Sequence, residues 1–556
     1  MATPAAANYS DGAAAQDDSS SPSTSPNLPP PPMSSFVRPM LTDMYQITMV
    51  FAYWKQKRHQ DRAIFELFFR KTPFKGEFAI MAGIDEVLKY LAHFRFSEEE
   101  LIYLRKQIPH AEEDFFVWLG QLDCSAVKVY ALPDGTTCFG IEPLIRVEGP
   151  LAIGQLLETT LLNLVNYPSL IATNAARHRL AVGPDKVLIE FGLRRAQGPD
   201  GAMSAAKYSY LGGFDGTSNV LAGRLLSIAI SGTHAHAYVQ SYVSLDDLQN
   251  PFLDDQNLVE KALAYRSTLG FSDSNLGEFA AFVAYAQSWP DNFLCLVDTY
   301  DTLNSGIPNF LSVALALHDL GYAPVGVRLD SGDLAYLSKR IRAWFTRVAS
   351  THGRPTFEKL RIVASNNINE DVLYALSKQG HSIDAFGVGT HLVTCQAQPA
   401  LGCVYKLVEI CGKPRIKISN EVEKVTLPSR KDLYRFFNES GVAVVDFMTK
   451  NGEAAPKPGQ RRLCRHPFDS KKRAYVTPST VEPLLKLVWD GQAGGIQPGA
   501  LRTLGESREF VMDQLKGIRE DVLRHINPTP YKVSVSEELH ALLHQLWEMN
   551  APVGQL

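Results

Sequence analysis

Residues 325–333 read VGVRLDSGD, a short apolar run that ends in a cluster of charged side chains. Five similar runs, each followed by polar or glycine-rich residues, occur at 187–189, 228–230, 293–297, 361–364 and 385–386. Buried parallel strands have uninterrupted apolar sequences of this kind, and helical segments follow most of these runs. The pattern therefore predicts a parallel α/β sheet between residues 186 and 395.

The polar clusters come where the predicted strands end. In an α/β barrel, the carboxyl ends of the strands build the active site. Turns between strands and helices are also rich in Gly, Asp and Asn for conformational reasons alone. Because the six clusters together contain Arg, His and Asp, they favour a barrel-type active site over a set of ordinary turns.

Four segments are expected along the chain. Residues 1–37 are rich in Ala, Ser and Pro and predict a disordered tail. We expect an N-terminal α/β domain over 38–165, the barrel over 166–430 and a C-terminal segment without recognisable chemistry over 431–556. The tail has acidic residues but no basic residue before Arg38, and it lacks an apolar core, so it resembles neither a transit peptide nor a secretory signal.

Composition excludes several classes of partner. The chain has 556 residues and a formal net charge of −4, so no nucleic acid is expected to bind. It has no run of about 18 apolar residues that could cross a membrane. Its seven cysteines show no CxxC spacing, which indicates reduced thiols and a cytosolic enzyme.

Residues 387–390 read GVGT and follow a predicted strand. Gly387 and Gly389 would let backbone N–H groups approach an anion closely, and Thr390 could donate its hydroxyl. Such turns are common in α/β proteins, so this one predicts a phosphate site only in combination with the other clusters.

Asp330 and Asp333 place two carboxylates on one turn, which could bind a sugar diol or a Mg²⁺ that bridges a pyrophosphate. Asp333 could instead, or in addition, cap the helix expected from Leu334. Arg328 lies two residues before Asp330, so strand alternation directs both side chains to one face. Arg328 could bind a carboxylate or a phosphate, and the alternative is a structural ion pair with a neighbouring acid.

His234 and His236 are separated by one residue and would share a face of a strand. Three interpretations remain open: a metal-binding HxH pair, a histidine that carries a phosphoryl group, and two unrelated histidines. The sequence shows no obvious third histidine ligand, which weakens the first interpretation.

Seven segments resemble the nicotinate phosphoribosyltransferase family. They read LTDMYQITM (41–49), RRAQGPDG (194–201), YSYLGGFDGTSNVLAG (208–223), GTHAH (232–236), GVRLDSGDL (326–334), SNNI (365–368) and GVGT (387–390). The resemblance runs from about residue 40 to about residue 430 and is weaker beyond it. Taken together and in this order, the motifs are highly specific.

The resemblance implies an irregular, incomplete α/β barrel of the TIM type, with an N-terminal mixed α/β domain and a C-terminal segment packed on it. It also implies a ligase-type reaction of NAD biosynthesis. In this reaction nicotinate, phosphoribosyl pyrophosphate, ATP and water give nicotinate mononucleotide, pyrophosphate, ADP and phosphate. Mg²⁺ or Mn²⁺ as cofactor, ATP as co-substrate and a homodimer with shared active sites are implied in the same way.

The resemblance assigns roles to the positions that match its motifs. His236 would be the phosphorylated catalytic histidine, and Asp330, a candidate metal ligand, would stabilise positive charge on the ribose. The nicotinate site would contain Tyr45 (from the partner subunit), Phe191, Thr233 and Arg328. The phosphoribosyl pyrophosphate site would contain Thr390, Gly389, Gly387, Asp333, Asn366 and Arg194. Ser218 and Asp298 also match positions of the family's motifs.

Two kinds of enzyme remain as alternatives. A phosphoribosyltransferase that uses nicotinamide or quinolinate would share the scaffold. A metal-dependent amidohydrolase would also have an HxH pair, but near the start of its barrel and with further histidine ligands on later strands.

Overall fold

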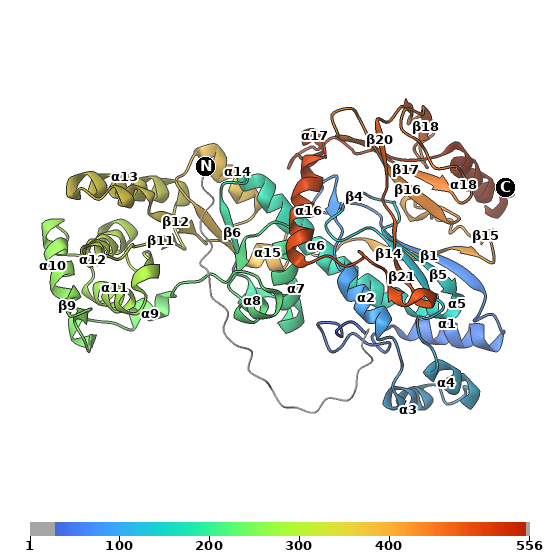
Figure 1. Ribbon diagram of the computed structural model, residues 1–556, viewed down its shortest axis with the longest axis horizontal. Helices are drawn as coiled ribbons and strands as arrows, with labels where there is room; N and C mark the ends of the chain where they lie inside the picture. Colours follow the sequence, from blue (N-terminus) through green and yellow to red (C-terminus); the bar gives the residue numbers. More distant parts are fainter. Residues whose placement is uncertain (1–27, 552–556) are drawn as a thin grey trace.

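The computed structural model describes residues 28–551, which form three main sheets and the helices packed around them (Figure 1). The parallel sheet with its helices lies at one end of an elongated molecule, and the two other sheets lie at the opposite end. The part of the predicted tail at 1–27 lies outside the described residues. The rest of it, 28–37, contacts the folded body, since the Met33 N–H donates to Glu86 Oε2 at 2.8 Å. Another contact there is the Pro29 carbonyl, 3.0 Å from His93 Nε2.

The first sheet has six parallel strands in the order β10-β11-β12-β13-β6-β7. Their bounds are β10 Leu294–Leu296, β11 Gly326–Leu329, β12 Arg361–Ala364, β13 Ala385–Val388, β6 Val187–Glu190 and β7 Gly216–Thr217. Five of the six predicted apolar runs are thus confirmed as strands. The sixth, 228–230, contributes only an isolated bridge between Ile230 and Thr217.

The sheet is curved but does not close by a continuous ladder. Between its edge strands β7 and β10 runs the irregular segment 230–235. Ile230 pairs with Thr217 on one side, and His234 Nε2 accepts a hydrogen bond from the Leu296 N–H at 3.3 Å on the other. The irregular, incomplete barrel expected from the sequence is therefore confirmed.

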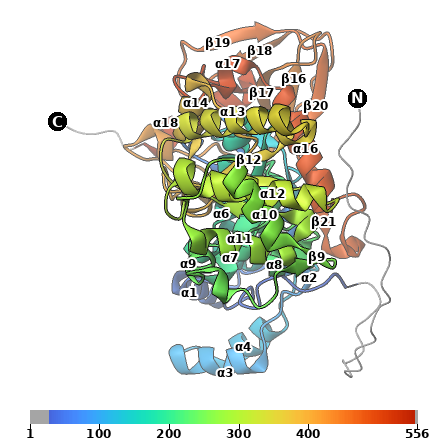
Figure 2. The same ribbon diagram turned by 90° about the vertical axis from the view of Figure 1, so that its left-hand side faces the viewer.

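Helices cover the outer face of this sheet, as Figure 2 shows for the helices that face the viewer. They include α10 Leu258–Thr268, α11 Leu276–Ser288, α12 Ile307–Asp319, α13 Leu334–His352 and α14 Glu370–Gln379. Asp333 caps α13, because its Oδ1 accepts a hydrogen bond from the Tyr336 N–H at 2.9 Å. Short polar turns join β11 to α13 and β12 to α14, which places the turn residues at one edge of the sheet.

The second sheet draws its strands from distant parts of the chain. Its order is β15-β14-β1-β5-β3-β21-β22. The bounds are β15 Lys413–Pro414, β14 Cys403–Ile410, β1 Arg62–Phe69, β5 Ile145–Pro150, β3 Lys128–Ala131, β21 Lys486–Asp490 and β22 Gly495–Ile496. The N-terminal domain thus includes strands that the sequence analysis assigned to the barrel and to the C-terminal segment. A strand can pair with a sheet edge formed by a distant part of the chain. Domains predicted as contiguous segments therefore could not include these strands.

Helix α6, Glu158–Val182, also crosses the boundary expected at 165/166. It runs for 25 residues with Pro168 inside it, and most of its side chains are buried. This helix joins the N-terminal domain to the barrel as one rigid element.

The C-terminal region contains a third sheet, with the order β19-β18-β23-β17-β16-β20. The bounds are β19 Arg473–Val476, β18 Arg462–Arg465, β23 Val533–Val535, β17 Ala443–Lys450, β16 Lys431–Phe437 and β20 Thr480–Pro483. Helices α16 Leu504–Lys516 and α18 Glu537–Asn550 also belong to this region, and the sheet was not predicted from the sequence. The outer strands are short and mostly exposed, so they lack a clear apolar alternation.

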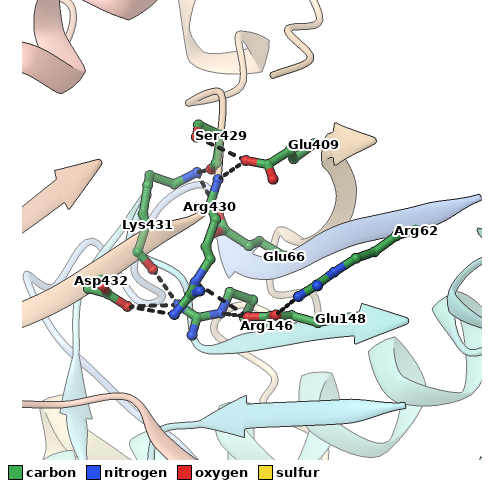
Figure 3. A network of polar contacts seen from close by, with 9 residues as sticks. All are labelled: Arg62, Glu66, Arg146, Glu148, Glu409, Ser429, Arg430, Lys431 and Asp432. Carbon is green, nitrogen blue, oxygen red and sulfur yellow. Dashed lines mark hydrogen bonds and ion pairs between the residues drawn. The ribbon is translucent and has the colours of Figure 1, made fainter. Parts of the chain in front are cut away.

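A buried ionic network joins the second and third sheets (Figure 3). Lys431 on β16 forms an ion pair with Glu66 on β1, with Nζ 2.7 Å from Oε2, and both side chains are almost fully buried. Arg146 on β5 donates from Nη1 to the Lys431 carbonyl at 2.6 Å, and it forms an ion pair with Glu148 in which Nε lies 2.9 Å from Oε1. These contacts fix the C-terminal sheet against the N-terminal domain.

Two general expectations can be compared with the structure. Within residues 28–551, no helix is long and apolar enough to cross a membrane. All seven cysteines are free thiols.

Candidate active site

A cavity of about 500 Å³ opens at the carboxyl ends of the parallel strands. It is lined by residues that follow β6, β11, β12 and β13 and by the segment that crosses the gap in the barrel. Of the predicted site residues, those that line it are Phe191, Arg194, Ser218, Thr233, Arg328, Asp330, Asn366, Gly387, Gly389 and Thr390. Residues far apart in sequence therefore converge on one cavity.

Arg328 extends from β11 and is held at one side of the cavity. Its Nη1 donates to Thr233 Oγ1 at 2.9 Å, and its Nη2 donates to the His234 carbonyl at 3.0 Å. Its Nε is buried without a hydrogen-bond partner among the described residues. Burial lowers the pKa of Arg328, whereas the nearby Asp330 and Asp298 raise it. No ion pair engages this guanidinium within 28–551, so the alternative of a structural ion pair does not describe it.

Asp330 is oriented by its neighbours at the end of β11. Its Oδ1 accepts a hydrogen bond from Ser365 Oγ at 2.7 Å, and its backbone N–H donates to Asp298 Oδ2 at 3.1 Å. Asp298 follows β10, and its Oδ1 is buried without a partner in the described structure. The Asp298 carboxylate thus lies beside the Asp330 backbone, at the ends of the adjacent strands β10 and β11.

The two histidines of the 232–236 motif point in different directions. His234 is buried, and its ring packs against Tyr285 with a centroid distance of 4.7 Å. Burial, followed by the charge of Arg328, lowers the pKa of His234 to about 4. His236 begins the short helix α9, His236–Gln240, with Nδ1 at 3.2 Å from Thr299 Oγ1 and Nε2 at 3.8 Å from Asp330 Oδ2.

The positions of His234 and His236 distinguish between the three interpretations of this histidine pair. The residues do not share a strand face as we expected, because the segment is irregular up to Ala235 and helical after it. Among the described residues, no group of three or more His, Cys, Asp or Glu side chains is placed to hold a metal. The HxH metal site of an amidohydrolase is therefore not present, and His236 lies at the rim of the cavity beside Asp330.

The GVGT stretch at 387–390 spans the end of β13, and Gly387 is still part of that strand. Gly387 has a packing role, whereas we expected an anion-binding role for it. A Cβ on Gly387 would lie 2.2 Å from Cδ2 of Phe191, so the missing side chain makes room for that ring. Gly389 precedes the four-residue helix α15, Thr390–Val393. Asn174 on α6 fixes α15, because its Nδ2 donates to the carbonyls of His391 and Leu392 at 3.0 and 3.1 Å.

Four predicted residues do not line this cavity in the single chain. One of them is Asp298, which follows β10 and accepts from the Asp330 N–H. Asp333 caps α13, and His236 lies at the rim. Tyr45 lies on α1, Met44–Lys55, which belongs to the opposite end of the molecule in Figure 1 and leaves its side chain about half exposed (47%). A contribution from Tyr45 to this cavity would require a second copy of the chain.

Sequence reasoning overlooked several lining residues. Arg195, Ser365, Asn367 and His391 face the same cavity. Each is adjacent in sequence to a predicted site residue. The motifs that indicated those residues could therefore have indicated these four as well. Which of two adjacent side chains faces the cavity depends on the local backbone, as at Asn367, where φ is +46°.

A cavity lined by Arg194, Arg195, Arg328 and Asp330 at the carboxyl edge of parallel strands is the arrangement of an α/β-barrel enzyme that acts on anionic substrates. Models of the nicotinate phosphoribosyltransferase N-terminal domain, family and C-terminal domain match residues 40–166, 187–441 and 430–543. The chain belongs to the nicotinate phosphoribosyltransferase family.

Individual relatives agree with this assignment over nearly the whole chain. Nicotinate phosphoribosyltransferase 1 of Arabidopsis thaliana is 51% identical over 94% of this chain and 96% of its own length. The human nicotinate phosphoribosyltransferase is 44% identical over 94% of this chain and 99% of its own length. The crystal structure of human nicotinic acid phosphoribosyltransferase superposes with a TM-score of 0.82 at 42% identity, covering 91% of this chain and 99% of that chain.

Proposed function

We propose that this enzyme joins nicotinate to phosphoribosyl pyrophosphate in the cavity at the end of the parallel sheet, with ATP hydrolysis assisting the reaction. The observation that carries the proposal is Arg328, an arginine without an ion pair in the described structure, held beside Asp330 in a chain of this family. Its remaining donors suit a carboxylate, which nicotinate has and nicotinamide lacks.

The pyridine ring would lie against Phe191, with its carboxylate toward Arg328. Gly387 supports the Phe191 ring from behind, because no Cβ stands between them. The ring nitrogen then attacks C1 of the ribose: the C1–N bond forms, and the C1–O bond breaks with its electron pair leaving on pyrophosphate. Asp330 would stabilise the positive charge that develops on the sugar.

The phosphate groups would occupy the side of the cavity formed by Arg194, Asn366, Gly389 and Thr390. A divalent cation such as Mg²⁺ or Mn²⁺ fits next to them, since Asp298 Oδ1 is buried without a partner and Asp330 lies beside it. These two carboxylates and the diphosphate oxygens would hold the ion, which supplies charge neutralisation for the departing pyrophosphate. Asp298 and Asp330 also keep each other oriented through the Asp330 N–H.

His236 would accept the γ-phosphoryl group of ATP and later release it to water as phosphate. Its position at the rim leaves about 40% of its side chain exposed, which gives ATP access. A phosphoryl group there adds roughly −1.5 to −2 charge next to the diphosphate site. It would thereby change the affinity for substrate and product between steps.

Labelling with γ-³²P-ATP tests this role. We expect acid-labile phosphate on the wild type, none on His236→Ala and normal labelling of His110→Ala, whose histidine lies away from the cavity. Equal labelling of His236→Ala and wild type would refute the phosphohistidine.

Substrate identity is tested by assaying the purified enzyme with nicotinate, nicotinamide and quinolinate, each with and without ATP. We expect turnover of nicotinate, stimulated by ATP, and little turnover of the other two. Preference for nicotinamide or quinolinate would replace the proposed substrate by one of the alternatives.

The enzyme would act as a cytosolic homodimer in which Tyr45 enters the partner's cavity. Mixing an inactive Tyr45→Ala variant with an inactive Arg328→Ala variant tests this arrangement. Mixed dimers would contain one cavity with both residues intact, so activity should return on subunit exchange. Absence of any recovery in dimers shown to be mixed would argue against a shared site.

A further inference from the structure

A second cavity lies between the N-terminal domain and the C-terminal sheet. It has a volume of about 720 Å³ and shares no lining residue with the cavity at the parallel sheet. Its walls are the loop 70–77 after β1, the β18–β19 hairpin and residues 530–534 at β23. None of the site residues predicted from the sequence lines it.

The rim of the second cavity is strongly cationic. Its lysines and arginines are Arg70, Lys71, Lys75, Lys471, Lys472, Arg473 and Lys532. Glu77 is the single acidic residue in the lining, although the whole chain has a formal net charge of −4. Neighbouring positive charges repel one another, so an anion bound among these side chains would reduce their repulsion.

Most of these cations have no acidic partner. Within residues 28–551, only Lys71 and Lys472 form ion pairs, with Glu423 at 2.7 Å and with Asp469 at 3.4 Å. The other five are left without a carboxylate within ion-pair distance in this part of the chain. Elsewhere in the molecule many lysines and arginines are paired, so the rim differs from a solvated surface with mixed charges.

The floor of the second cavity is apolar and aromatic. The Phe139 and Tyr531 rings are stacked with a centroid distance of 3.6 Å and an interplanar angle of 9°. The Tyr531 hydroxyl donates to Asp446 Oδ1 at 2.9 Å, which anchors that ring. Buried Val533 and Cys464 complete the floor, so a ring system could lie there without desolvating a charge.

His466 adds a neutral donor to the rim. Its Nδ1 accepts hydrogen bonds from the Phe468 and Asp469 N–H groups at 3.2 and 3.0 Å, so the ring proton belongs on Nε2. Burial, followed by the charge of Lys472, lowers the pKa of His466. A bound anion would counter the effect of Lys472 on the pKa of His466.

We propose that this cavity is a second ligand site, which binds a nucleoside polyphosphate with its base on the Phe139–Tyr531 floor and its phosphates among the lysines and arginines of the rim. The volume falls in the range of small-molecule sites, and the division into an apolar floor and a charged rim matches the two halves of such a ligand. An inorganic phosphate would use only the rim. The site does not depend on the proposed transfer reaction, because its residues are separate from that cavity.

Photolabelling of the full-length enzyme with 8-azido-ATP tests the location directly. Because the azido group is on the base, we expect labelled peptides from 139–141 or 530–534, in addition to any label near the parallel sheet. Labelling should also occur in His236→Ala, which separates this site from ATP use in catalysis. Label confined to barrel peptides would overturn the proposal.

ATP binding by equilibrium dialysis gives an independent test. One class of ATP sites should be weakened at least about tenfold in Lys472→Glu/Arg473→Glu relative to the wild type, because two cations that would contact the phosphates are replaced by carboxylates. Lys516→Glu, a charge reversal at an exposed helix position, should bind like the wild type. Identical isotherms for all three proteins would contradict the proposal. Inorganic triphosphate should compete more weakly than ATP, because it has no base to contact the floor. Equal competition would contradict binding of the base on the Phe139–Tyr531 floor.

Discussion

Arg328 is the residue on which the choice of substrate should depend. Two of its donors are engaged by Thr233 and the His234 carbonyl, which fixes the plane of the guanidinium. A fixed guanidinium presents two parallel donors to a carboxylate, whereas a lysine presents a point charge. Replacing Arg328 by lysine therefore keeps the positive charge but removes the parallel donors, and the effect on substrate binding can be measured.

For Arg328→Lys we expect the KM for nicotinate to rise roughly 10- to 100-fold, because one or two charged hydrogen bonds are lost. The KM for phosphoribosyl pyrophosphate should change much less. Steady-state kinetics with each substrate varied in turn measures both. If the phosphoribosyl pyrophosphate KM rises instead, Arg328 binds phosphate and the ring carboxylate lies elsewhere.

His234 should make the folded state sensitive to acid. Its pKa falls from 6.5 to about 4 on folding, so between these values the unfolded chain binds a proton that the folded chain does not. This group therefore has no effect on stability above pH 6.5, and it destabilises the fold progressively as the pH falls to about 4. The full effect is on the order of 3 kcal/mol.

We expect His234→Gln, which can still accept from the Leu296 N–H, to lose less stability in that pH window. The midpoint of urea unfolding, measured at several pH values between 4 and 7, gives the comparison. Parallel curves for variant and wild type would show that the acid sensitivity arises at other groups.

At the scale of elements, α6 determines where α15 lies. Asn174 is buried on α6 and donates to two carbonyls of the short helix that carries Thr390. A four-residue helix has little intrinsic stability, so its position depends on such external contacts. The phosphate side of the cavity is thus held by a helix that also packs into the N-terminal domain.

For Asn174→Ala we expect the KM for phosphoribosyl pyrophosphate to rise about tenfold, while the nicotinate KM changes little. Two buried carbonyls lose their donor, at a cost of about 1–3 kcal/mol each. Asn257→Ala is a matched control, because Asn257 caps α10 away from the cavity and its loss should lower stability without changing either KM. Equal kinetic effects of the two variants would mean that Asn174 acts only through global stability.

The elements also show what the sequence could and could not predict. Five strands of the parallel sheet were predictable because they are buried on both faces and read as apolar runs. The third sheet was not, because strands such as β19 are exposed and carry no apolar run. At the cavity, strand alternation placed Arg328 and Asp330 together, whereas the opposite directions of His234 and His236 depend on the start of α9, which no sequence period indicated.

At the scale of the whole molecule, the two ends are coupled by helix α6 and the C-terminal sheet is fixed by the ionic network of Figure 3. Lys431 is central to this network. It pairs with Glu66, donates from Nζ to the Leu427 and Ser429 carbonyls at 2.8 and 2.7 Å, and accepts from Arg146 through its own carbonyl. Buried ion pairs contribute little net stability, but removing one partner leaves an uncompensated charge.

Lys431→Met should therefore destabilise the protein by about 3–5 kcal/mol, because Glu66 would remain buried without its cation. Glu66→Gln/Lys431→Met should recover part of this loss, since the unpaired carboxylate is then gone. Lys128→Met serves as control: it breaks the Lys128–Asp490 pair, in which the lysine is 43% exposed, and should cost less than about 1 kcal/mol. The midpoints of urea unfolding of the four proteins give these differences. If Lys431→Met and Lys128→Met are equally mild, water reaches the junction and the C-terminal sheet is held by its apolar contacts alone.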